Sequence, residues 1–169
     1  SIRPGRYNMK GISSIGQVVK VISSQSADRV KVTLLEGWTV EQFSDELKDK
    51  LQIDSFEFMR LSQDYDFIHS LSLDAPSLEG FLFPDTYILL NTYTEEEIIR
   101  ILVNQHQHNH HQLLKEFKPA QRMNMLEITA LASIIQGEAV YEDEMPIISS
   151  VYHNRLEKNM RLQADPTIQ

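Results

Sequence analysis

The spacing of apolar residues along this chain follows two different periods. Val30, Val32 and Leu34 alternate with Lys31 and Thr33, which is typical of a half-buried strand. Elsewhere apolar residues recur every three or four positions, which indicates helices with one buried face. This helical spacing covers residues 12–22, 40–50, 55–64, 94–117, 124–139 and 143–157. The pattern predicts a mixed chain in which short strands accompany mainly helical segments.

Polar residues mark where several of these helices begin and end. Thr39 is placed to cap the helix over 40–50, with Gln42 three residues later as its capping-box partner. Acidic residues fill the first turn of the helix after Thr94, where they complement the helix dipole. Pro119 limits the other end of that helix. Residues 66–77 and the turn around Pro84 are expected to be connections without regular structure.

Composition narrows the class of protein further. The chain has 169 residues and a formal net charge of −8, and this acidic surface would repel a nucleic acid backbone. It has no cysteine, which excludes disulfides, thiolate zinc ligands and thiol catalysis within this sequence. No run approaches the roughly 18 apolar residues of a membrane span. The opening Ser1–Gly5 resembles the interior of a protein, so we expect an upstream anchor outside this sequence.

Glu138 is the candidate catalytic residue. At 100° per residue, Leu131, Ile134 and Ile135 share a helix face with Glu138, whereas Gln136 points about 200° away. Burial disfavours the charged form of a carboxyl, which suits a general acid. The alternative is a structural carboxylate paired with an arginine such as Arg155.

A polar cluster follows this helix. Asn154, Gln163, Asp165 and Thr167 offer amides, a carboxylate and a hydroxyl, which suit the many hydroxyl groups of a carbohydrate. The alternative, which spacing alone favours, is a solvated loop.

Glu79 and Asp85 lie in a second candidate binding segment. They stand among Phe81, Phe83 and Tyr87, and aromatic faces with polar edges commonly line sugar sites. The alternative, which we favour for this segment, is a structural hairpin whose aromatic rings fill the core.

The histidines of the helix over 94–117 are a weaker signal. His106 and His110 are four positions apart and could share a metal. No acidic or thiol ligand adjoins them in sequence, so we expect a solvated helix face with His108 and His111, and no metal. A phosphate-binding loop, a nucleophile elbow and a dinucleotide fingerprint are also absent from the sequence.

Three motifs in order resemble the endolytic murein transglycosylases of the MltG (YceG-like) family. The first is Leu35-Glu36-Gly37-Trp38-Thr39-Val40, which resembles the family's LysM-like segment. The second runs from Leu78 to Tyr87 and resembles its Glu-Gly-aromatic…Pro-Asp-Thr-aromatic signature. The third comprises Ala132–Glu138, Tyr152–Leu156 and Met160–Thr167, and resembles the catalytic block. Each motif is weak alone, but the ordered set spans most of the chain.

The resemblance implies an α+β fold with two subdomains. A small LysM-like β/α lobe would cover residues 1–66, and a mainly helical, lysozyme-like catalytic lobe would cover residues 67–169. The family continues past the Pro-Thr of the third motif, so we expect the catalytic lobe to be incomplete at Gln169. Gln136 stands where the family motif has its first glutamate, and the resemblance fits best with Glu138 as the catalytic glutamate.

The resemblance also implies an activity. The family cleaves the bond between N-acetylmuramic acid and N-acetylglucosamine in peptidoglycan and leaves 1,6-anhydro ends, as a carbon–oxygen lyase without a cofactor. Glu138 would act first as acid and then as base, and Asn154, Gln163, Asp165 and Thr167 would hold the sugars, with Glu79 and Asp85 as weaker candidates. One N-terminal helix would anchor the full-length protein outside the cytoplasmic membrane, beside the cell-wall synthesis machinery.

Two other functions stay open. The chain would be a non-catalytic peptidoglycan-binding module if the LysM-like lobe dominates and the C-terminal part expected beyond this sequence is essential for catalysis. An aminodeoxychorismate lyase would need pyridoxal phosphate on a lysine and a phosphate cradle, and the lysines here lie mostly on polar helix faces.

Overall fold

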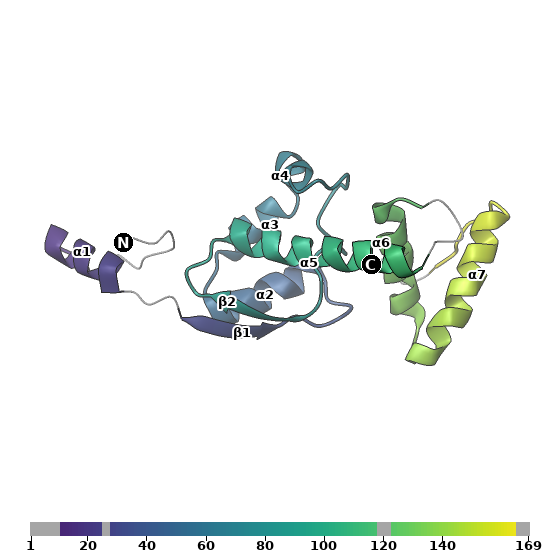
Figure 1. The fold of residues 1–169 in the computed structure, drawn as a ribbon, viewed down its shortest axis with the longest axis horizontal. Helices are drawn as coiled ribbons and strands as arrows, with labels where there is room; N and C mark the ends of the chain where they lie inside the picture. The colour runs from purple at the N-terminus through teal and green to yellow at the C-terminus, as the bar shows by residue number, and fades with distance from the viewer. Residues whose placement is uncertain (1–10, 25–27, 118–122, 165–169) are drawn as a thin grey trace. The chain divides into compact units, whose positions relative to one another are not determined.

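The fold is a set of helices with one small sheet (Figure 1), which confirms the α+β class. The structure is a computed structural model, and it describes residues 11–24, 28–117 and 123–164. No helix within these ranges combines the length and apolar character needed to cross a membrane. In chain order the elements are α1 (Ile15–Ser24), β1 (Arg29–Thr33), α2 (Val40–Leu51), α3 (Ser55–Leu61), α4 (Tyr65–Ser70), β2 (Thr86–Leu90), α5 (Glu95–Glu116), α6 (Met125–Glu138), η1 (Glu142–Glu144) and α7 (Met145–Glu157).

The chain divides into two compact units, residues 1–109 and residues 110–169. The subdomain boundary expected between residues 66 and 67 falls inside the first unit. The LysM-like and lysozyme-like assignments of the two lobes stay predictions.

The sheet of the first unit pairs β1 with β2 in antiparallel register, with Lys31 opposite Ile88. Its inner face carries Val32 and Leu89, which are fully buried. The expected strand at residues 30–34 is therefore confirmed as β1, whereas β2 was not predicted. Ile88 is apolar but exposed, so β2 lacks the alternation of apolar and polar residues that marks a half-buried strand.

Local capping explains where the helices of the first unit begin. The hydroxyl of Thr39 accepts from the backbone N–H of Gln42, and the Gln42 side chain accepts from the N–H of Thr39 at 2.8 Å, which confirms the predicted capping box. Asp54 caps α3 by accepting from the backbone N–H groups of Phe56 and Glu57. Asp64 caps α4 through the N–H of Phe67 at 3.0 Å. The sequence did not predict α4, because six residues are too few to display a helical period.

The second unit is built on two helices that contact each other, α6 and α7 (Figure 1). Asn124 and Glu127 form a reciprocal capping box at the start of α6. The helices predicted over 124–139 and 143–157 are confirmed within two residues at each end. Tyr152 on α7 and Leu131 on α6 are buried and supply the core of this unit. The short turn that contains η1 joins the two helices.

Candidate functional site

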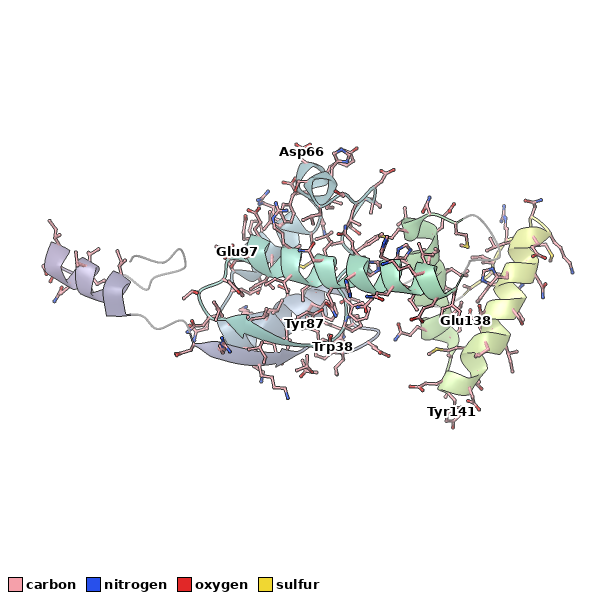
Figure 2. All side chains as sticks on the ribbon, viewed as in Figure 1. Trp38, Asp66, Tyr87, Glu97, Glu138 and Tyr141 are labelled. Atoms are coloured by element: carbon pink, nitrogen blue, oxygen red, sulfur yellow. The ribbon has the colours of Figure 1, made fainter. Side chains whose placement is uncertain are left out.

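Glu138 is the last residue of α6, at the point where the chain turns toward α7 (Figure 2). Its side chain is half-buried. The helix is closed directly after it, since the backbone N–H of Ala139 donates to the carbonyl of Ile135 at 3.0 Å. The alternative of an ion pair with Arg155 is wrong. Arg155 instead donates to the carbonyl of Leu162 and lies over the Tyr152 ring, with 5.9 Å between its guanidinium carbon and the ring centroid.

The Glu138 carboxylate therefore has no structural role that the described residues show. Across the described ranges, it makes neither an ion pair nor a hydrogen bond. A half-buried carboxylate of this kind retains its oxygens for a ligand.

The sequence predicted that Glu138 would be more buried than Gln136, and this prediction is wrong. Both side chains are half-buried, and Ile134 and Ile135 are half-buried as well, whereas Leu131 is fully covered. The reason is that the apolar residues of α6 lie on several of its faces. The sequence of this helix therefore does not define one narrow buried stripe. The chemical difference remains, since Glu138 can carry a proton at its carboxyl and Gln136 has only an amide.

The polar cluster predicted to hold sugars is partly visible. Asn154 is exposed on α7, and Gln163 is exposed with a left-handed backbone φ of 52°. Both belong to the same compact unit as Glu138. Asp165 and Thr167 lie outside the described residues.

Glu79 and Asp85 belong to the other unit and have structural partners there. An oxygen of Glu79 accepts from the backbone N–H of Val40 at 3.2 Å. Asp85 accepts from the N–H of Thr86 at 2.7 Å. The neighbouring rings of Phe81 and Tyr87 are buried, so the core interpretation is confirmed for these two aromatic residues.

The histidines of α5 are only partly a solvated face. His108 and His111 are exposed, but His106 packs against Phe81 with ring centroids 5.2 Å apart. Burial, and then the neighbouring His111, lower the pKa of His110. In the described part of the chain, no group of three or more His, Cys, Asp or Glu side chains could hold a metal ion.

One pocket in the second unit was not predicted. It has a volume of about 340 Å³ and is lined by side chains that include Phe117, Ile128, Leu131 and Ile135, with His153 as its polar member. Apolar walls of this kind give few hydrogen bonds to a sugar. The pocket alone therefore does not supply a carbohydrate site.

Comparisons with known proteins identify the family. The sequence profile of the YceG-like family matches residues 1–169, the whole chain. The chain belongs to the YceG-like family. A crystal structure of a YceG-like protein from Listeria monocytogenes superposes with a TM-score of 0.70 at 27% identity, over 93% of this chain and 57% of that one.

Two curated relatives of this YceG-like chain are named endolytic murein transglycosylase. The protein from Bacillus subtilis (strain 168) is 27% identical over 180 residues, which cover 97% of this chain and 50% of the relative. The protein from Streptococcus pneumoniae serotype 2 (strain D39 / NCTC 7466) is 23% identical over 195 residues, covering 99% of this chain and 35% of the relative. The chain thus spans half or less of the length of these relatives.

Proposed function

We propose that this chain carries the catalytic glutamate of a peptidoglycan lytic transglycosylase. The observation that carries the proposal is the half-buried carboxylate of Glu138 at the end of α6, which has no partner among the residues that the structure describes, in a member of the YceG-like family. The names of the two relatives support peptidoglycan as the substrate class. The bond proposed to be cleaved joins N-acetylmuramic acid to N-acetylglucosamine.

In the first step, the protonated carboxyl of Glu138 donates its proton to the glycosidic oxygen that leaves. The bond between this oxygen and C1 of the muramic acid breaks, and positive charge develops on the ring as an oxocarbenium ion. The substrate's own N-acetyl group assists at this stage. The position of Glu138 supports this role, because its carboxyl oxygens have no hydrogen-bond or ion-pair partner among the described residues and can approach a glycosidic oxygen.

In the second step, the Glu138 carboxylate accepts the proton of the C6 hydroxyl of the same sugar. The C6 oxygen then attacks C1 and closes a 1,6-anhydro ring, so that no water is consumed. The proton lost in the first step is regained, and the residue is ready for another cycle. A single carboxylate therefore suffices, whereas most glycosidases need two.

Substrate binding is assigned to polar residues on α7 and in the segment after it. Asn154 and Gln163 are exposed in the same unit as Glu138, and Asp165 and Thr167 complete the proposed set. Glu79 and Asp85 are weaker candidates because they already accept backbone hydrogen bonds. The full-length protein is proposed to act outside the cytoplasmic membrane, held by an N-terminal anchor, together with the cell-wall synthesis machinery.

The test is digestion of purified peptidoglycan by the full-length protein and by its Glu138→Gln variant, with products identified by mass spectrometry. Anhydro-muramyl fragments from the parent and none from the variant are the expected result. The Gln136→Ala variant is the matched control, because it alters a half-buried polar residue on the same helix. Binding of the parent without cleavage would overturn the enzymatic proposal and favour a peptidoglycan-binding module.

A further inference from the structure

The turn that follows Glu138 is fixed by one carboxylate. A single oxygen of Glu144, Oε2, accepts from the backbone N–H of Val140 at 3.0 Å and from the N–H of Tyr141 at 3.2 Å. The N–H of Glu144 in turn donates to the carbonyl of Tyr141 at 3.1 Å. The side chain thus reaches back along the chain and closes the segment between α6 and α7.

Glu144 stands at the cap position of α7, yet its side chain does not cap that helix. Ser, Thr, Asp and Asn side chains at this position ordinarily accept from N–H groups of the helix that follows. Here the acceptor serves the residues that precede it instead. The first turn of α7 has Pro146, which lacks an N–H and lowers the need for such a cap.

We propose that Glu144 is a positioning residue for Glu138, a role that rests on the proposed transglycosylase function. The first of the two N–H groups that Glu144 binds belongs to the second residue after Glu138. The residue between them, Ala139, donates its own N–H to the carbonyl of Ile135. The backbone on the far side of Glu138 therefore cannot swing freely, and the direction in which its side chain leaves α6 is restricted. A carboxyl that must first donate and then accept a proton at different atoms of one sugar needs such a fixed direction.

Glu144 is not itself assigned a proton-transfer step. The oxygen that faces the turn is occupied by two donors, and its partners are backbone groups of the same loop. The sequence alone did not indicate this residue, because its acidic neighbours Glu142 and Asp143 give it the appearance of a solvated charge run.

The experiment compares Glu144→Ala and Glu144→Gln in the full-length protein on soluble glycan strands. Because both donors bind one oxygen, the amide oxygen of glutamine can replace it, whereas alanine offers no acceptor. We expect Glu144→Ala to lower kcat about 10-fold to 100-fold with KM changed far less, since a displacement of about 1 Å can cost about 10²-fold. Glu144→Gln should restore kcat to near the parent value.

The matched control is Glu127→Ala. Glu127 also accepts a backbone hydrogen bond, from the N–H of Asn124 at 2.8 Å, but at the opposite end of α6. We expect this variant to lower the melting temperature without a specific loss of kcat. Amide exchange at Val140 and Tyr141 gives a readout independent of activity, and it should accelerate in Glu144→Ala and stay slow in Glu127→Ala.

The outcomes separate this inference from the proposed function. If Glu138→Gln retains full activity, the proposed function itself fails. If Glu138→Gln is inactive while Glu144→Ala retains the parent kcat, or matches Glu127→Ala, the positioning role is overturned and the proposed function stands. Failure of Glu144→Gln to restore kcat, or loss of folding in both Glu144 variants, would also overturn it.

Discussion

A hydrogen bond joins Glu79 to the backbone N–H of Val40, 39 positions away in the sequence. Val40 is the first residue of α2, and the N–H groups of a first helical turn have no partner within the helix. Thr39 and Gln42 bind each other's backbone N–H groups through their side chains, and Glu79 accepts from the N–H of Val40. The connection before β2 is thereby tied to the start of α2.

This contact predicts that Glu79→Ala lowers the free energy of unfolding by about 1 kcal/mol, the usual value of one such hydrogen bond. Glu79→Gln should lower it less, because an amide oxygen can still accept from Val40. Urea denaturation of both variants measures the difference. Unchanged stability in Glu79→Ala, combined with weaker binding to glycan strands, would instead assign this carboxylate to the substrate.

Two phenylalanines on α3 differ sharply in burial, which makes them a matched pair. Phe58 is 0% exposed and Phe56 is 80% exposed. We expect Phe58→Ala to cost about 3–5 kcal/mol, because it removes transfer energy and leaves a cavity, and Phe56→Ala to cost about 0.5 kcal/mol or less. Equal losses in chemical denaturation would contradict the packing described for this unit.

Tyr87 predicts a loss of stability at alkaline pH. Burial, and then the nearby Asp85, raise the pKa of its phenol, whose hydroxyl donates to the carbonyl of Phe83 at 2.6 Å. The unfolded chain releases this proton near pH 10, while the folded protein keeps it. The unfolded state then binds fewer protons, so stability declines as the pH rises above about 10.

The Tyr87→Phe variant isolates this contribution from that of the lysines. It should be less stable than the parent at pH 7, because the carbonyl of Phe83 loses its donor. Its stability should also decline less steeply above about pH 10. The measurement is the free energy of unfolding of both proteins by urea denaturation at a series of pH values. The same pH dependence in the two proteins would show that the phenol does not titrate differently in the folded state.

Gln136 stands in place of the first acid of the family motif, so we expect that acid to be dispensable in this chain. Glu138 alone performs both proton transfers in the proposed reaction, so Gln136→Glu should leave the yield of anhydro products within about threefold of the parent, far from the 10²-fold or larger change of a lost proton-transfer group. Quantitative mass spectrometry of a timed digest measures this yield. A gain of 10²-fold or more would assign the main proton transfer to position 136.

The sequence by itself determined most of the local structure. The helical periods defined α2, α5, α6 and α7, and the capping pair of Thr39 and Gln42 was visible in the order of the residues. These features depend on neighbours within one helical turn, so their physical causes are contained in short stretches of chain. The ordered motifs also indicated the family to which the chain belongs.

Only the tertiary structure decided which polar groups have partners. The sequence could not show that Arg155 binds the carbonyl of Leu162 instead of Glu138, or that Glu79 reaches Val40. The sequence also did not predict β2. This strand pairs with β1, which is far away in the chain, and it carries an exposed apolar residue, Ile88. Hydrogen bonds between distant residues depend on how the backbone folds in space, and a linear pattern of residue types does not contain that information.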